Sequence, residues 1–461
     1  MSVSSRPLRS RRFLLLAGAL GALGSSLPAA EPADAPAGSP TGSPTGSPAA
    51  WADAQLPALL DLYRHLHSHP ELSNEETATA ARLAEEWRAA GYEVTTGVGG
   101  TGVVGVLRNP PADGGEGPTV MFRCDLDALP VSEATGLPFA SQVTVERPGG
   151  GTTGVMHACG HDVHMTSVTG AGRYFAEHKD QWSGTAMLIA QPAEEIGAGA
   201  RAMLADGLFE RFPRPDYAVA LHVTPNAAAG TIETLAGYSL ANVDSVDITF
   251  HGRGGHGAQP HATQDPIVMA AEFILSAQAI VAREVKPTDP AVVTVGSIHA
   301  GSKHNIIPDE ATLQLTVRSY SEAVRTQLIA AIERRAKAAA AAAGAEPPTV
   351  SSSEGTPSLY NDPALTARLT AVFQQELGAE AVGTGEPSMG GEDFSRYGKA
   401  GVPILMYRLG AVAPRDLMRY EKAGVEPPSL HSATFAPDAE TCLPIGVRTL
   451  VAAGLDLLNA P

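Results

Sequence analysis

The spacing of hydrophobic and polar positions changes several times along the chain, and each change predicts a different element. Residues 56–66 repeat apolar side chains at helical spacing, and a second helix is predicted from an N-cap at Asn74 to about Ala90. Four apolar runs have the length of buried strands, at 103–107, 119–123, 185–190 and 217–221. Strands that alternate with helices in this way predict an α/β domain, in which helices cover a mixed sheet.

The pattern changes at about residue 241. Alternating residues at 243–250 predict a strand, followed by a helix at 265–283, strands at 292–298 and 312–319, a helix at 321–343 and a strand at 349–353. This strand-helix-strand-strand-helix-strand order predicts a ferredoxin-like α+β domain. A helix at 359–377, a strand at 403–408 and a helix at 445–458 then return to the first pattern. We therefore predict a catalytic domain formed by 51–240 and 354–461, interrupted by a satellite domain at 241–353.

The amino terminus has the pattern of an export signal. Four arginines precede a short apolar run, and small residues follow it, which predicts a signal peptide over residues 1–30. The stretch Ser10-Arg11-Arg12-Phe13-Leu14-Leu15 resembles a twin-arginine signal. Residues 31–50 repeat Gly-Ser-Pro-Thr and predict a flexible linker. The expected location is therefore outside the cytoplasm, periplasmic or secreted.

Charge and composition limit the partners. The chain has 461 residues, too many for one core, and its net charge is 32 − 49 = −17. Strong acidity argues against nucleic acid and anionic membranes as partners. We expect no apolar run beyond residue 30 to be long enough to span a bilayer, and hence no membrane anchor. Three cysteines without regular spacing do not predict a disulfide framework.

The chemistry is concentrated in one stretch, Met156-His157-Ala158-Cys159-Gly160-His161-Asp162-Val163-His164. Cys159 and His161 are separated by one glycine, so a thiolate and an imidazole can hold one metal ion or bridge two. The alternative is a small buried cysteine beside histidines that make local hydrogen bonds. For Cys159 and His161 taken alone, these two interpretations are about equally good.

Polar side chains at three predicted strand ends favour the interpretation that this stretch binds metal. Asp125 and Asp127 follow the second strand, and one of them is expected to orient a metal-binding histidine. Glu194 and Glu195 follow another buried strand, so one can bind metal while the other acts as a general base. His222 follows the next apolar run. Ligand-type residues at successive strand ends indicate one shared site.

These motifs, in this order, resemble the metal-dependent aminoacylase and amidohydrolase family, which includes hippurate hydrolases, auxin-conjugate hydrolases and related carboxypeptidases. The resemblance extends from about residue 56 to 459. The motifs that carry it are His67-Ser68-His69-Pro70-Glu71, Asp125-Leu126-Asp127-Ala128-Leu129-Pro130, Met156-His157-Ala158-Cys159-Gly160-His161-Asp162, Gln191-Pro192-Ala193-Glu194-Glu195, Leu221-His222-Val223, Gly254-Gly255-His256-Gly257, His304-Asn305-Ile306-Ile307-Pro308, Met389-Gly390-Gly391-Glu392-Asp393 and Leu430-His431-Ser432.

The resemblance implies a zinc-peptidase-like catalytic domain with two divalent metal ions, whether Zn, Mn, Co or Ni. It assigns the ligands as Cys159, His161, Glu195, His222 and His431, with Cys159 as the bridge. Glu194 would be the general base and Asp127 the second catalytic residue. In the satellite domain, His256 would help to stabilise the oxyanion, in some relatives from the partner subunit, and Asn305 and Arg318 would anchor a substrate carboxylate.

The expected function is hydrolysis of the amide bond of N-acyl amino acids or similar small conjugates, by a homodimer joined through the satellite domain. Three alternatives remain open: a dipeptidase or carboxypeptidase, a decayed scaffold that only binds metal, and a cysteine hydrolase that uses Cys159 as its nucleophile. An intact Glu194 counts against the decayed scaffold. Two loops, 147–153 and 411–429, are longer than is usual for the family and leave the identity of the substrate open.

Overall fold

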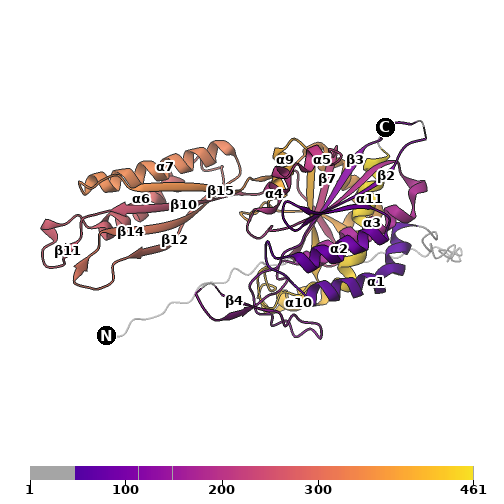
Figure 1. Ribbon diagram of the computed structural model, residues 1–461, viewed down its shortest axis with the longest axis horizontal. Helices are drawn as coiled ribbons and strands as arrows, with labels where there is room; N and C mark the ends of the chain where they lie inside the picture. Colours follow the sequence, from indigo (N-terminus) through magenta and orange to yellow (C-terminus); the bar gives the residue numbers. More distant parts are fainter. Residues whose placement is uncertain (1–46, 113, 148, 460–461) are drawn as a thin grey trace, which may run out of the picture. The chain divides into compact units, whose positions relative to one another are not determined.

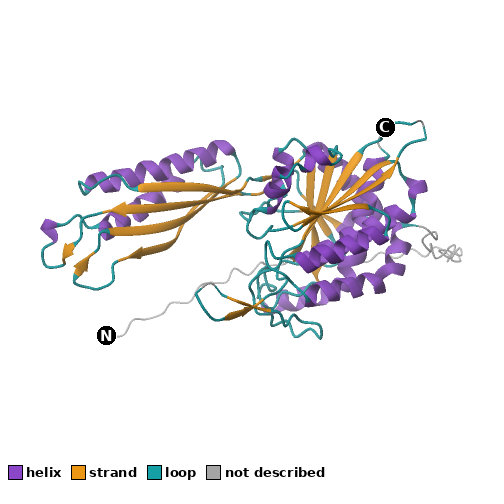
Figure 2. Ribbon diagram, in the orientation of Figure 1, coloured by secondary structure: helices purple, strands orange, loops and turns teal. Residues whose placement is uncertain are grey.

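The computed structural model describes residues 47–112, 114–147 and 149–459, and these form two main sheets with their own helices, together with three two-stranded sheets (Figure 1, Figure 2). The predicted signal peptide lies outside the described residues, as does nearly all of the predicted linker. The large sheet has the strand order β1-β2-β6-β3-β7-β18-β8-β17. Its strands are β1 (Glu93–Val98), β2 (Gly102–Asn109), β3 (Thr119–Asp125), β6 (Gly184–Gln191), β7 (Tyr217–Ala228), β8 (Ile232–Thr234), β17 (Val382–Thr384) and β18 (Ile404–Val412).

The large sheet is mixed, as predicted. The central strands β6, β3, β7 and β18 run parallel, whereas β1–β2, β2–β6 and β18–β8 are antiparallel. Every residue of β3 and β6 is buried. Along β6, Leu188 packs into one core cluster and Met187 and Ile189 pack into the cluster on the opposite face. An uninterrupted apolar strand is thus explained by helices on both faces of the sheet.

Helices close the two faces of the sheet (Figure 1). On one face lie α1 (Pro48–Ser68), α2 (Thr77–Ala89), α3 (His161–Glu177), α8 (Pro363–Leu377) and α11 (Ala439–Leu458). On the other lie α4 (Gly199–Ala205), α5 (Leu208–Arg211) and α9 (Ser395–Lys399). The remaining helix of this domain is α10 (Pro414–Ala423), and the short strands are β4 (Thr144–Glu146), β5 (Thr152–Gly154), β9 (Gly237–Leu240) and β16 (Leu359–Asn361).

Several predicted boundaries were wrong, each for a local reason. The linker was predicted to reach residue 50, but α1 begins at Pro48 because Ser47 caps it by accepting from the Ala50 amide at 3.2 Å. Asn74 is not an N-cap: it has φ 67°, and Glu76 occupies the cap position of α2. Residues 359–361, predicted as the start of a helix, form strand β16. Helix α8 begins only after Asp362, whose side chain caps it.

The second sheet has the ferredoxin-like arrangement that the sequence predicted. Its strands are β10 (Asn242–His251), β12 (Ala291–Ala300), β14 (Glu310–Ser319) and β15 (Thr349–Thr356), in the spatial order β12-β14-β10-β15 with every neighbouring pair antiparallel. Helices α6 (Pro266–Arg283) and α7 (Glu322–Ala342) cover one face and form a separate core with β10 and β14. β15 runs on to Thr356, past the predicted boundary at 353. A small sheet pairs β11 (Gly255–His256) with β13 (Ile306–Ile307).

Among the described residues, two helices, α6 and α11, are long and apolar enough to cross a membrane by length and composition alone. The expectation that no such segment follows residue 30 was therefore wrong. In the structure α11 packs against α1, α3 and α8 and buries most of its length. Helix α6 buries one face, including Met269 and Phe273, against the second sheet. Both helices have the packing of core-facing helices in a folded domain.

A buried ion triad joins α1 to the start of α3. Nδ1 of His67 lies 2.7 Å from Asp162 Oδ2, and Nε2 lies 3.1 Å from Glu133 Oε1, with all three side chains at most 1% exposed. Burial disfavours the charged ring, but hydrogen bonds to Asp162 and Glu133 outweigh it and raise the pKa of His67 to about 10. His67 is therefore an imidazolium that neutralises two buried carboxylates, and Glu133 is held further by the Ser141 amide at 2.6 Å.

We predict that His67→Gln lowers the free energy of unfolding by about 3–5 kcal/mol at pH 7, because two buried carboxylates lose their counter-charge. His67 has a raised folded-state pKa, so its contribution is complete below the unfolded value near 6.5 and is lost as pH rises through about 10. The difference in thermal midpoint between wild type and His67→Gln should therefore shrink from pH 7 to pH 10. The exposed neighbour gives a matched control, His69→Gln, expected to change stability by less than about 0.5 kcal/mol. A pH-independent difference would contradict the charged triad.

Candidate metal centre

The polar residues after β3, β6 and β7 meet because these strands are parallel neighbours in the sheet. Asp125 pairs with Gln191 at the ends of β3 and β6, and Arg123 pairs with Ala220 on β7. His222, two residues after Ala220, therefore lies level with Asp125. It is not at a strand end as predicted, since β7 continues to Ala228. The site forms where β3 and β6 stop and β7 runs on.

Gly160 allows the Cys-x-His stretch to pack closely against β7. Its φ is 77°, a left-handed conformation that favours glycine, and it occupies the N-cap position of α3. A Cβ at this position would lie 2.4 Å from Cγ2 of Val223 on β7. A side chain is therefore excluded both by conformation and by contact, and Cys159 and His161 come to lie on either side of this bend against β7.

The structure brings together all five predicted ligand residues. The first group comprises Cys159, His161 and His222, and the second comprises Cys159, Glu195 and His431. In each group the ligand atoms all lie within 4.8 Å of one another. Cys159 belongs to both groups, which is the arrangement that a bridging ligand between two ions requires.

Hydrogen bonds orient the imidazoles toward the centre. The Nδ1 of His161 bonds to the Asp127 backbone carbonyl at 2.8 Å, and the Nδ1 of His222 bonds to the Val223 carbonyl at 2.8 Å. A carbonyl oxygen only accepts, so both Nδ1 atoms carry a proton, and Nε2 is the ring atom of each histidine that is left to bind a metal ion. The Nε2 of His222 lies 3.6 Å from Cys159 Sγ.

Unpaired buried atoms at the centre fit a metal ion. Nε2 of His161 and Oε1 of Glu195 are buried, lie 3.8 Å apart and have no hydrogen-bond partner among the described residues. Such atoms are costly to leave unpaired, and a cation between them satisfies both. Burial also raises the pKa of Cys159 well above its usual value, so the thiolate needs nearby positive charge. Mixed sulfur, nitrogen and oxygen donors suit a borderline-soft divalent ion.

Asp127 supports both His161 and the glutamate turn. Its Oδ2 accepts from Ser73 Oγ at 2.6 Å and from the Glu195 amide at 3.0 Å. Its Oδ1 is 3.5 Å from Nδ1 of His161, farther away than the Asp127 backbone oxygen. Asp127 thus orients His161 mainly through its main chain, and uses its carboxylate to fix the backbone at Glu195.

Glu194 lies beside the two ligand groups without belonging to either. Its carboxylate joins a cluster with His161 and Glu195 and another with Glu392 and Asp393. Burial, followed by the charges of Glu392 and Glu195, raises the pKa of Glu194 well above its usual value. Glu194 and Glu195 therefore have different surroundings, as a division between base and ligand requires.

Arg123, which was not predicted from the sequence as a site residue, organises these acids. Arg123 is 1% exposed, and its guanidinium contacts Asp125 Oδ2 at 2.8 Å, Glu392 Oε1 at 2.8 Å and Asp393 Oδ1 at 3.2 Å. Its Nε donates to Gln191 at 3.1 Å. Glu392 and Asp393 are thus committed to Arg123 and are not free to bind a metal. The available signal was an arginine inside an otherwise apolar strand.

His164 also belongs to the support rather than to the ligands. The Val223 amide donates to Nε2 of His164 at 3.0 Å, and Nδ1 lies 2.7 Å from Asp125 Oδ1. Burial lowers the pKa of His164 to about 4, so the ring is neutral and donates its Nδ1 proton to Asp125. Both ring nitrogens are therefore occupied, although His164 is close enough to Asp125 and His161 to form a cluster.

A second missed residue, Glu76, supports the turn that carries Glu194. Its buried carboxylate accepts from the Ala193 amide at 2.8 Å and from Thr101 Oγ1 at 2.6 Å. Ala193 has φ 49°, a strained value for a residue with a side chain. The hydrogen bond from Glu76 thus helps to hold an unfavourable backbone conformation immediately before Glu194.

Within one chain, the three predicted substrate residues do not meet at the centre. His256 on β11 and Asn305 lie together, where the Gly257 amide donates to the Asn305 carbonyl at 2.9 Å. Arg318 lies near the other end of β14, about 26 Å along the strand from Glu310 at roughly 3.3 Å per residue. Its Nη1 donates to the Met389 carbonyl at 2.7 Å, in the loop that leads to Glu392. Their substrate roles stay predictions.

Comparison with known proteins yields a matching family model and several similar proteins. Residues 121–431 match the model of peptidase family M20/M25/M40. Thermostable carboxypeptidase 2 of Saccharolobus solfataricus is 36% identical over 386 residues, covering 83% of this chain and 91% of that protein. Hippurate hydrolase of Campylobacter jejuni is 40% identical over 277 residues, covering 59% and 68%. N-acetyl-L-cysteine deacetylase of Bacillus subtilis is 37% identical over 343 residues, covering 74% and 77%.

Among solved structures, the Bacillus subtilis YXEP protein, described as a dinuclear metal binding peptidase from the M20 family, superposes with a TM-score of 0.72. It is 29% identical, and the match covers 88% of this chain and 99% of that one. The likeness therefore extends over both sheets and the residues gathered between β3, β6 and β7.

We predict that Cys159→Ser and His431→Gln change the bound metal to different extents. The wild type should hold about two ions per chain, His431→Gln about one and Cys159→Ser close to none, because Cys159 belongs to both ligand groups. Elemental analysis after dialysis measures the ratio. His261→Gln, an exposed histidine in the satellite domain, is the matched control and should retain the wild-type content. If Cys159→Ser binds as much metal as the wild type, the shared ligand is wrong.

Proposed function

The chain belongs to peptidase family M20/M25/M40, and from this premise we propose that it hydrolyses the amide bond of N-acyl amino acids, releasing the carboxylic acid and the free amino acid. It is an enzyme of the family's dinuclear metal amidohydrolase and peptidase type. The observation that carries the proposal is the position of Glu194: it lies next to the two groups that share Cys159 and outside both of them.

The residues present fit two divalent ions. Cys159, His161 and His222 would hold one, and Cys159, Glu195 and His431 the other. Ions bound there would polarise the scissile carbonyl and lower the pKa of water, whichever of Zn, Mn, Co or Ni is used. The unpaired His161 Nε2 and Glu195 Oε1 support this assignment.

Glu194 is the general base of the proposed reaction. Its carboxylate takes a proton from the attacking water and returns it to the nitrogen of the leaving amino acid. The neighbouring Glu392 and Asp393 are held by Arg123, so they shape the surroundings of Glu194 without taking the proton themselves. Asp127 keeps His161 and the Glu195 backbone in place during turnover.

The relatives support an amino acid on the leaving side of the amide. Hippurate and N-acetyl-L-cysteine, named for two relatives, are both N-acyl amino acids. A second candidate is a carboxypeptidase acting on short peptides, because the first relative described above carries that name. Both kinds of substrate present a free carboxylate next to the cleaved amide. The two functions therefore need the same recognition of this carboxylate, and they differ in the group on the acyl side of the amide.

We predict that Glu194→Gln reduces kcat by at least about 10³-fold while the metal content stays at the wild-type value. The variant keeps the size of the side chain but cannot accept a proton. Activity is measured as release of free amino acid from N-acetyl, N-benzoyl and dipeptide substrates, before and after chelation and metal add-back. If the wild type releases amino acid from the acyl substrates alone, the amidohydrolase is favoured. If it releases amino acid from the dipeptides alone, the peptidase is favoured. Substantial activity in the metal-loaded variant would refute the role of Glu194.

We also propose a homodimer joined through the satellite domain, in which His256 and Asn305 act at the centre of the other chain. β12 is an edge strand of its sheet, and apolar side chains stand exposed on and near it: Ile267 at 41%, Val268 at 53%, Leu275 at 76% and Ile298 at 46%. Exposed apolar surface beside an unpaired strand is typical of an interface. His256 and Asn305 are also exposed and lie away from their own metal-binding side chains.

A mixing experiment tests this assembly. His256→Ala and Glu194→Gln should each be nearly inactive, since each dimer lacks either the partner's histidine or the base. After the two variants are mixed and exchange subunits, a mixed dimer holds one site with both groups, and up to about a quarter of the wild-type activity should return. The absence of any recovery from a verified mixed dimer would show that His256 does not act across the interface.

Export is proposed on the amino-terminal pattern alone. Residues 1–30 would be removed as a signal peptide, resembling the twin-arginine type, and the enzyme would act in the periplasm or outside the cell. Mass determination of the mature amino terminus from the producing cell tests this assignment.

A further inference from the structure

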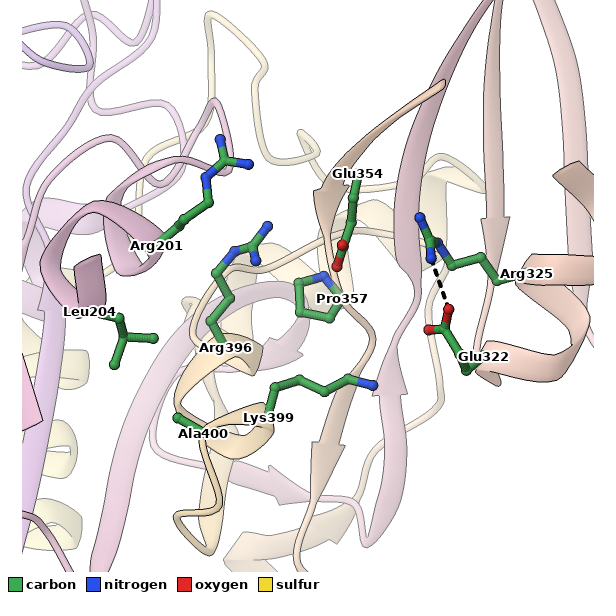
Figure 3. A pocket seen from close by; sticks show the side chains of 9 residues that line it. All are labelled: Arg201, Leu204, Glu322, Arg325, Glu354, Pro357, Arg396, Lys399 and Ala400. Carbon is green, nitrogen blue, oxygen red and sulfur yellow. Dashed lines mark hydrogen bonds and ion pairs between the residues drawn. The ribbon is translucent and has the colours of Figure 1, made fainter. Parts of the chain in front are cut away.

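A cavity of about 460 Å³ lies away from the metal-binding side chains, between α4 and α9 of the catalytic domain and β15 and α7 of the satellite domain (Figure 3). Its charged lining comprises four cations and two acids: Arg201, Arg325, Arg396, Lys399, Glu322 and Glu354. An excess of positive side chains around one cavity is unusual in a chain with a net charge of −17.

One of the four cations is already neutralised. Arg325 contacts Asp244 Oδ1 at 2.7 Å and Glu322 Oε1 at 2.8 Å, and Figure 3 shows it turned toward Glu322. The side chains of Arg201 and Lys399 have no hydrogen bond or ion pair in the described part of the chain. Of the two acids in the lining, Glu322 is paired with Arg325, which leaves Glu354 to face Arg201, Arg396 and Lys399.

Arg396 has an unused hydrogen-bond donor beside this cavity. Its Nη2 donates to the Gly355 carbonyl of β15 at 2.7 Å, but its Nε is buried and has no partner among the described residues. Figure 3 shows its side chain between Arg201 on one side and Pro357 and Glu354 on the other. Burial lowers the pKa of Arg396, and the charge of Arg201 lowers it further while Glu354 opposes the change.

We propose that this cavity binds a divalent oxyanion of the phosphate class, held by Arg201, Arg396 and Lys399. Two guanidinium groups close enough to repel one another, one of them with an unused buried N–H, provide the donors and the charge that such an anion requires. The volume exceeds that of one phosphate, so the cavity also admits a larger molecule that carries this group. The proposal does not depend on the reaction proposed for the metal centre.

The position of the site connects it to the carboxylates of the metal centre. α4 begins shortly after Glu195, and α9 begins directly after Asp393 and Phe394. The Ala200 amide, next to Arg201, donates to Asp393 Oδ2 at 2.9 Å. An anion held by Arg201 and Arg396 therefore joins the two segments that carry the carboxylates of the centre, and ties both to β15.

The test is calorimetric titration of the metal-loaded enzyme with inorganic phosphate at constant ionic strength. Arg201→Gln and Arg396→Gln should each weaken phosphate binding about tenfold or more, as the loss of a charge-assisted hydrogen bond implies. Arg201 is exposed and has no partner to lose, so its variant is expected to fold as the wild type does. Arg88→Gln, which removes an exposed arginine from α2, is the matched control and should bind phosphate like the wild type.

Three results would overturn the proposal. Phosphate bound instead at the metal ions would give the same isotherm in Arg201→Gln and Arg396→Gln as in the wild type. If the effect were only one of net charge, Arg88→Gln would lose as much phosphate affinity as Arg201→Gln and Arg396→Gln. Acetate at the same ionic strength should show no comparable binding, and equal affinity for acetate would contradict a site for a divalent anion.

Discussion

The buried guanidinium of Arg123 is the contact on which the arrangement of carboxylates in this protein depends. It holds Asp125 at the end of its own strand, and Glu392 and Asp393 from a segment that follows in sequence only after the whole satellite domain. Removing one partner from such a buried network typically costs about 3–5 kcal/mol, because the remaining charges are left without compensation. The two halves of the catalytic domain are thus joined by electrostatics as well as by the pairing of β18 with β7.

One arginine does not balance the charge it gathers. Six acids lie around the centre: Asp125, Asp127, Glu194, Glu195, Glu392 and Asp393. Burial, with the neighbouring Glu392, raises the pKa of Asp393 to about 7 despite the opposing effect of Arg123. An excess of negative charge in a desolvated site is unfavourable unless cations enter it. Two buried atoms in the same region, His161 Nε2 and Glu195 Oε1, have no hydrogen-bond partner among the described residues.

The sequence was informative where a local pattern decides the structure. The runs that became β3 and β6, the ferredoxin-like order of the insert and the residues around Cys159 all follow from periodicity or from a recognisable motif. It was uninformative where distant segments meet. In the sequence, Arg123 is one polar residue within an apolar strand. Nothing near it indicates its partners, because Glu392 and Asp393 lie about 270 residues away. Asn74 was misassigned because an asparagine suits an N-cap and a left-handed turn equally well.

The satellite domain is connected to the centre through the loop before Glu392. Arg318 of β14 binds the Met389 carbonyl, and the Ala241 amide donates to the Gly390 carbonyl at 2.9 Å. A Cβ on Gly391 would lie 2.5 Å from Cγ2 of Val243, so β10 passes too close for any side chain at that position. Glu392 follows directly and binds Arg123. The Met-Gly-Gly-Glu-Asp motif therefore makes two contacts at once: its glycines admit the satellite strand, and its acids complete the network around Arg123.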